Sequence, residues 1–146
     1  VIAGVKDCAE YLSRPSDSFS IPTWKKWTKM LTHETNKKGW PVVFKGDSTG
    51  LYTALRSVFT NVHVQGQASG SLRDLYASFL DEAAEVTGRP EWREIANHYR
   101  KLAEEWNTYA NDALPGNYPD LKAMQEILLR KNKVMLEKGQ DVDLEL

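Results

Sequence analysis

The chain has 146 residues, which is enough for one domain with a buried core. Its basic and acidic side chains are scattered along the sequence and give a formal net charge of -1, so no nucleic-acid partner is expected. No apolar run approaches the roughly 18 to 20 residues of a membrane-spanning helix, and the N-terminal segment lacks a signal-peptide layout, so no membrane partner is expected either. The single cysteine cannot form an internal disulfide, which fits a cytoplasmic location.

The first predicted helix covers residues 1–13 and ends before Arg14 and Pro15. Its apolar residues recur at helical spacing on one face, which carries Val1, Val5, Cys8 and Leu12. Cys8 lies near the centre of this stripe. We therefore expect it to be buried and to serve in packing, although a cysteine is the obvious nucleophile candidate in any chain.

A second, short helix opens at Pro22, and its aligned apolar residues are Trp24, Trp27, Met30 and Leu31. Its lysines are either an RNA-binding surface or the solvated side of an amphipathic helix. The second interpretation is favoured because the aromatic residues occupy the apolar face. Residues 42–44 are expected to form a packed loop, because a lone strand has no partner.

Asp47 or Ser48 can cap a third helix, in which apolar residues recur through Val62. His33 lies near the end of the second helix and His63 near the end of the third. A cation is favourable beside the carboxyl end of a helix, so both histidines are expected to be capping residues.

The central feature is the stretch 71–114, which reads as two long amphipathic helices joined by a Gly-Arg-Pro turn. Ser71 is the predicted N-cap, and Asp74 supplies a carboxylate three residues later. Gly88 can adopt the left-handed conformation that ends a helix, and Pro90 suits the first turn of the next one. Because the turn is short, the helices should be antiparallel neighbours.

Both hairpin helices carry continuous apolar stripes that we expect to be buried. The first consists of Leu72, Leu75, Tyr76, Phe79, Leu80, Ala83 and Val86, and the second of Trp92, Ile95, Ala96, Tyr99, Leu102, Ala103, Trp106, Tyr109 and Ala110. A last helix has Pro119 in its first turn, and the acidic tail, residues 141–146, should fray. Strand patterns are missing, so we expect an all-α, single-domain bundle of five or six helices over residues 1–140, organised on the hairpin.

Polar residues at the borders of the stripes are the candidates for function. Arg73, Glu82 and Arg100 either pair with a neighbouring element or face a second domain, and structural pairing is favoured. His98 shares an edge with Glu91, Glu94 and Glu105, where a metal or general-base site could be built. A single helix supplies too few converging ligands, so a solvated histidine is favoured and no metal or cofactor is expected.

Several segments together resemble a known family. They are RDLYASFLDEAA at residues 73–84, the set Tyr99, Arg100 and Trp106, ALP at 113–115, and upstream AEYLSRPSDSFSIPTWKKWTKML and KKGWPVVF. The chain is similar over about residues 8–138 to a C-terminal helical domain of unknown function that follows a butirosin biosynthesis protein H-like N-terminal domain. Arg73, Tyr76, Glu82, Arg100 and Trp106 match positions of that domain's pattern, with no known roles.

The resemblance implies a function in antibiotic or secondary-metabolite biosynthesis. The namesake looks like a cysteine-peptidase-type acyltransferase that moves an aminoacyl group from an acyl carrier protein to an aminoglycoside, with its nucleophilic Cys and His in the N-terminal domain. We therefore expect this chain to be the C-terminal part of a longer protein, without catalytic residues of its own. Its expected partners are the catalytic domain and either an acyl carrier protein or a second copy of the chain. The alternatives are a stand-alone module that forms a homodimer through its Trp-rich faces, and a metal-dependent enzyme at His98.

Overall fold

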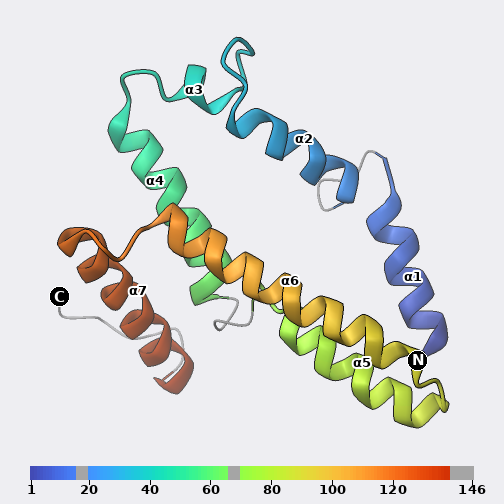
Figure 1. Cartoon of the computed structure of the whole chain (residues 1–146). Coiled ribbons are helices and arrows are strands. Elements are labelled where there is room, and N and C mark those ends of the chain that lie inside the picture. The colour runs from blue at the N-terminus through green and yellow to red at the C-terminus, as the bar shows by residue number, and fades with distance from the viewer. Residues whose placement is uncertain (16–19, 66–69, 139–146) are drawn as a thin grey trace. The chain divides into compact units, whose positions relative to one another are not determined.

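The computed structural model describes residues 1–15, 20–65 and 70–138. Over these residues the chain forms helices and no strands, so the all-α class is confirmed. The helices, drawn in Figure 1, are α1 (Ile2–Ser13), α2 (Ile21–Leu31), α3 (Trp40–Val43), α4 (Ser48–Phe59), the π-helix η1 (Thr60–Val64), α5 (Arg73–Thr87), α6 (Glu91–Ala113) and α7 (Pro119–Lys138). The tail that we expected to fray lies outside these residues.

The chain divides into two compact units, Val1–Tyr52 and Thr53–Leu146, with the boundary inside α4. Five or six helices were expected, and over the described residues all six predicted segments are helical, with the one-turn α3 in addition. None of the described helices is both long and apolar enough to cross a membrane.

The prediction of a loop at residues 42–44 is wrong for its first two residues, which belong to α3. Gly39 is the N-cap of α3, and Pro41 occupies one of its first two positions, where a missing amide costs nothing. The amides of Val42 and Val43 donate hydrogen bonds to the Gly39 carbonyl at 3.0 and 2.8 Å. An N-cap glycine with a proline two residues later therefore starts one helical turn here.

Aromatic side chains connect α2 with α3 in the first unit. The rings of Trp24 and Trp27 meet edge to face at 5.9 Å between centroids, Trp27 meets Trp40 at 6.2 Å, and Trp40 meets Phe44 at 5.3 Å. Such perpendicular contacts match the positive ring edge to the negative ring face. An edge-to-face series of aromatic rings therefore runs from α2 through Trp40 to Phe44.

The prediction that Cys8 is buried is wrong. Its side chain is exposed, and no residue of α1 is buried. The apolar stripe determines which face of α1 is hydrophobic, but burial also requires a second surface against that face. Among the described residues of the first unit, the contacts with α2 leave every residue of α1 at least partly exposed.

The α5–α6 hairpin forms as expected, with the two helices side by side (Figure 1). Gly88 has a φ of 66° and ends α5, and its amide and that of Arg89 bond back to the carbonyl of Ala84 or Glu85. This left-handed glycine closes the last turn and reverses the chain. Asp74 lies in the first turn of α5, where a carboxylate is favourable.

The expectation that the full apolar stripes are buried is wrong in part. The buried residues of the two helices are mostly alanines: Ala77, Leu80, Ala83 and Ala84 on α5, and Trp92, Ala96, Ala103, Ala110 and Ala113 on α6. Alanines let two helices approach closely, so the alanine faces meet and the longer side chains stand to one side. Leu75, Phe79 and Val86 of α5 and Ile95 and Leu102 of α6 are exposed.

The predicted N-cap is also wrong. Helix α5 begins at Arg73, its N-cap is Leu72 with a φ of 68°, and no side chain caps it. Gly70, Ser71 and Leu72 all have positive φ, so Ser71 cannot take the extended conformation of an N-cap. Its amide instead donates to the Val62 carbonyl at 3.1 Å, which ties the start of α5 to η1.

Candidate functional site

Arg73 is held where the chain enters α5. Its guanidinium lies 4.3 Å from the centroid of the Trp106 ring and donates hydrogen bonds to the carbonyls of Gly70, at 3.3 Å, and Ser71, at 2.8 Å. Burial lowers the pKa of Arg73, and its interaction with Tyr99 opposes that shift. The side chain thus fixes the left-handed segment 70–72 against α6, which is the structural pairing favoured from the sequence.

Tyr76 joins the same side of the hairpin. Its ring contacts Tyr99 of α6 at 4.8 Å and Phe79 of its own helix at 5.6 Å. Trp106 also contacts the Tyr109 ring at 5.9 Å. Four of the matched candidate residues, Arg73, Tyr76, Arg100 and Trp106, therefore lie in the α5–α6 contact.

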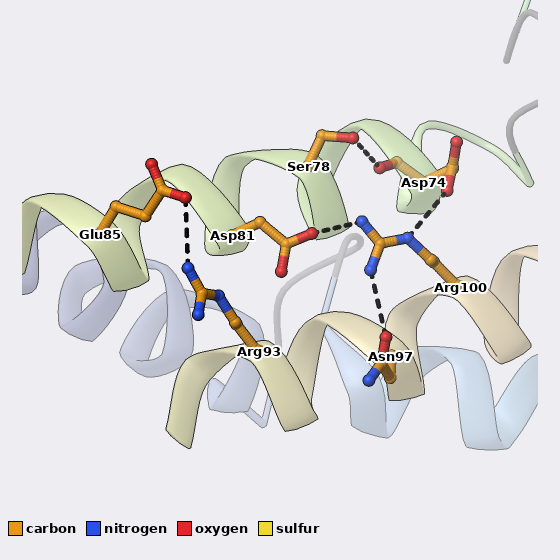
Figure 2. A network of polar contacts seen from close by, with 7 residues as sticks. All are labelled: Asp74, Ser78, Asp81, Glu85, Arg93, Asn97 and Arg100. Atoms are coloured by element: carbon orange, nitrogen blue, oxygen red, sulfur yellow. Dashed lines mark hydrogen bonds and ion pairs between the residues drawn. The ribbon is translucent and has the colours of Figure 1, made fainter. Parts of the chain in front are cut away.

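A charged seam runs along one side of the hairpin (Figure 2). Arg100 of α6 reaches between two carboxylates of α5, Asp81 at 2.5 Å and Asp74 at 3.9 Å, and also donates to Asn97 at 3.2 Å. The hydrogen bond to Asp81 raises the pKa of Arg100. Because the guanidinium is exposed, the seam serves to set register more than to stabilise the fold.

The second ion pair of the seam joins Arg93 and Glu85 at 3.2 Å. Neither residue was singled out from the sequence, and neither was Asp81. A signal exists, because Asp74 and Asp81 are seven residues apart, as are Arg93 and Arg100. Seven residues are about two helical turns, so each set lies on one side of its own helix, and Arg100 meets both aspartates while Arg93 meets Glu85.

Glu82 and His98 lie away from the seam. Both are exposed, and Glu82 makes no ion pair with any described residue. Among the residues placed in the structure, no three His, Cys, Asp or Glu side chains are grouped to hold a metal ion. The structure therefore does not gather Glu82 and His98 with the other four candidates.

His63 occupies a more structured environment than a helix cap. It lies in the last turn of η1, its ring stacks on Phe59 at 5.2 Å, and its Nδ1 lies 3.3 Å from the Asn107 Oδ1. The same oxygen accepts a hydrogen bond from the Gly70 amide at 3.2 Å. An oxygen cannot donate, so His63 Nδ1 carries the proton in this pair.

A shallow pocket of about 400 Å³ opens beside His63, between η1 and α7. Its lining residues are His63, Val64, Leu129, Asn132, Lys133, Leu136 and Glu137. Asn132 donates from Nδ2 to the Val64 carbonyl at 3.1 Å, which joins the two walls of the pocket.

His33, the other histidine predicted to cap a helix, lies beyond the end of α2. Its Nδ1 accepts a hydrogen bond from the Asn36 amide and so stabilises a turn.

The comparison with known proteins adds one finding. Residues 36–130 match the family described as Domain of unknown function (DUF4872). The chain belongs to this family. No curated protein and no solved structure matches it. The matched range contains the whole hairpin, with every candidate residue from Arg73 to Trp106, and leaves out Cys8. The family description carries no activity and no link to butirosin biosynthesis.

Proposed function

We propose that the chain is a helical accessory domain without catalytic residues, which docks on the catalytic part of a larger protein through the hairpin. The surface in question is the hairpin strip, defined as Leu75, Phe79, Val86, Ile95 and Leu102. Val86 is 78% exposed and Leu75 64%. Five large apolar side chains exposed together on one rigid support are typical of an interaction surface, and this observation carries the proposal.

Helical geometry supports placing all five residues on one side of the hairpin. Successive residues are rotated by about 100° around a helix axis. On α5, the strip residues lie roughly 130° around the axis from the centre of the buried alanine face. On α6, the strip residues lie roughly 75° from the centre of the alanine face of that helix, in the same sense of rotation. In antiparallel helices the same sense of rotation leads to the same side. Asp81 and Arg100 lie about 80° to 90° away in the opposite sense, which matches their ion pair.

Aromatic residues provide the floor of the strip. Tyr76 and Tyr99 are half-buried and contact each other across α5 and α6. Their angular positions around the two helix axes lie between the alanine face and the strip. The strip is thus a continuous surface supported by both helices.

The resemblance to butirosin biosynthesis protein H-like proteins suggests the partner. In this proposal the catalytic domain is a cysteine-peptidase-type acyltransferase domain, and the helical domain shapes its substrate cleft or its contact with a carrier protein. The gene upstream of Val1 gives the first test. A reading frame that encodes a Cys- and His-containing domain supports the proposal, and a start codon adjacent to Val1 overturns it.

A binding experiment tests the surface itself. The upstream domain and the present chain would be co-expressed as separate polypeptides, with a tag on one of them. We expect co-purification of the wild type and a loss of at least about tenfold in recovered partner for Leu75→Ser with Val86→Ser. Ile127→Ser on α7 is the matched control, because Ile127 is also an exposed aliphatic residue. Equal recovery of the partner with the wild type and with both variants would reject the hairpin strip as the docking surface.

The second candidate is a homodimer formed through the Trp-rich face of α2. It is favoured by one observation, the exposure of Ile21 and Trp24 on the same helix. Sedimentation over a range of protein concentrations tests it. A monomer at every concentration would exclude this alternative.

A further inference from the structure

We infer that the hairpin strip accepts an amphipathic helix of a partner protein whose apolar face is flanked by lysine or arginine. This inference rests on the proposed docking function and names the chemistry of the partner. It is drawn from the charges that surround the strip.

Carboxylates border the strip on both helices. Residues three or four positions apart are neighbours on a helix surface. On α5, Glu82 is such a neighbour of both Phe79 and Val86. On α6, Glu91 precedes Ile95 by four positions and Glu105 follows Leu102 by three.

These three carboxylates are exposed, and none forms an ion pair with a described residue. His98 stands between Ile95 and Leu102 on the α6 border. By the same spacing, Arg89 follows Val86 by three positions at the turn, and Lys101 precedes Glu105 by four on the outer side of the α6 border. The strip is therefore apolar along its centre, and carboxylates outnumber basic residues along its borders.

The charges along the borders favour one kind of binding partner over the others. Two copies that met strip to strip would bring like charges together, which costs free energy, and an anionic membrane would be repelled in the same way. A helix with a basic flank instead places opposite charges beside each border while its apolar face covers the strip. Charge complementarity thus selects this partner over a second copy of the chain.

The dimensions of the strip suit one helix. Leu75 and Val86 are eleven residues apart, which is about 16 Å along α5, or three turns of a docking helix. A partner helix lying over the α5–α6 hairpin would form a third helix at the usual separation of about 8 to 10 Å. Its apolar residues would recur at three- and four-residue spacing.

The test uses the full chain and two fluorescent 18-residue peptides. Both carry the same leucine stripe, one with lysine flanks and one with glutamate flanks. Fluorescence anisotropy at low ionic strength measures the two affinities. We expect the lysine peptide to bind at least about tenfold more tightly, because up to three ion pairs would form at the borders.

Charge reversal at the border is the decisive variant. Glu82→Lys with Glu91→Lys and Glu105→Lys should invert the peptide preference. Glu34→Lys with Asp112→Lys and Glu126→Lys changes the net charge equally at exposed positions off the strip, and it should leave the preference intact. Circular dichroism of each variant would verify that the fold is retained.

The outcomes separate this inference from the proposed function. Equal binding of the two peptides, or equal effects of the two triple variants, overturns the basic-helix partner. Binding of the chain to anionic vesicles in preference to the lysine peptide overturns it too. Loss of the lysine-peptide affinity in Leu75→Ser with Val86→Ser supports it. The co-purification experiment fails or succeeds independently, because it reports on the strip whatever the charge of its partner.

Discussion

Gly70 is a described glycine of the second unit at which an added side chain would meet the backbone of helix α6. Its φ is +59°, in the left-handed region, and a Cβ added there would overlap the backbone and side chain of Ala103 in α6. Its amide donates to the Asn107 side chain, so the residue is also fixed by a hydrogen bond to the same helix. A substitution at Gly70 therefore meets two separate penalties, one conformational and one steric.

The magnitude of Gly70→Ala follows from those penalties. A left-handed conformation costs an alanine about 1 to 2 kcal/mol, and forcing a methyl group into a packed contact costs about 1 to 3 kcal/mol more. The obstructing atoms include backbone of α6, which cannot rotate aside as a flexible side chain would. We expect the free energy of unfolding to fall by about 2 to 5 kcal/mol.

Gly88→Ala is the matched control for this prediction. Its φ of +66° imposes the same conformational penalty, but nothing lies within 4 Å of the added Cβ. Urea unfolding followed by circular dichroism would measure both variants. We expect Gly88→Ala to lose about 1 to 2 kcal/mol. If Gly70→Ala lost no more than Gly88→Ala, the close approach of residue 70 to α6 would be refuted.

Three further predictions concern exposure. Leu80→Ala should reduce the free energy of unfolding by about 2 to 4 kcal/mol, because Leu80 is 2% exposed. Val86→Ser should change the free energy of unfolding by less than about 0.5 kcal/mol. Similar losses for the two variants in urea unfolding would contradict the assignment of the buried face of α5. Cys8 should react with a thiol reagent in the native protein as fast as in urea, and protection in the native state would mean that α1 is covered. Burial raises the pKa of Tyr109, so its contribution to stability should be fully present below the unfolded tyrosine pKa of about 10 and be lost as pH rises through the folded value. Absorbance titration should show one late-ionising tyrosine that is missing in Tyr109→Phe, and no change in that phase would contradict the assignment.

Some features of the fold follow directly from local residue types. The hairpin turn is one, because Gly88 is a residue that adopts positive φ at little cost and Pro90 suits the start of a helix. The start of α4 is another. Its expected cap at Asp47 forms, with the carboxylate accepting a hydrogen bond from the Gly50 amide at 2.8 Å. Both depend on interactions within a few residues, so a sequence reading can identify them.

The candidate site was only partly accessible to such reasoning. Arg73 and Arg100 were recognised as border residues, and both pair with groups on the opposite helix or on the segment before it. Their partners were not identified, because helical spacing gives the direction of a side chain but not which residue of the neighbouring helix stands opposite. The role of His63 depends on Asn107, which is 44 residues away.

The all-α class, the positions of the long helices and the hairpin can be predicted from the sequence, since each depends on periodicity and on residues at helix ends. Which part of each apolar stripe is buried depends on tertiary packing and is visible only in the structure. The alanine faces of α5 and α6 pack together because short side chains allow the closest approach. With its alanine face turned toward α6, α5 leaves Leu75, Phe79 and Val86 exposed. An amphipathic pattern indicates which face of a helix is apolar. What covers that face depends on residues distant in the chain, and that is why Cys8 and the hairpin strip are exposed.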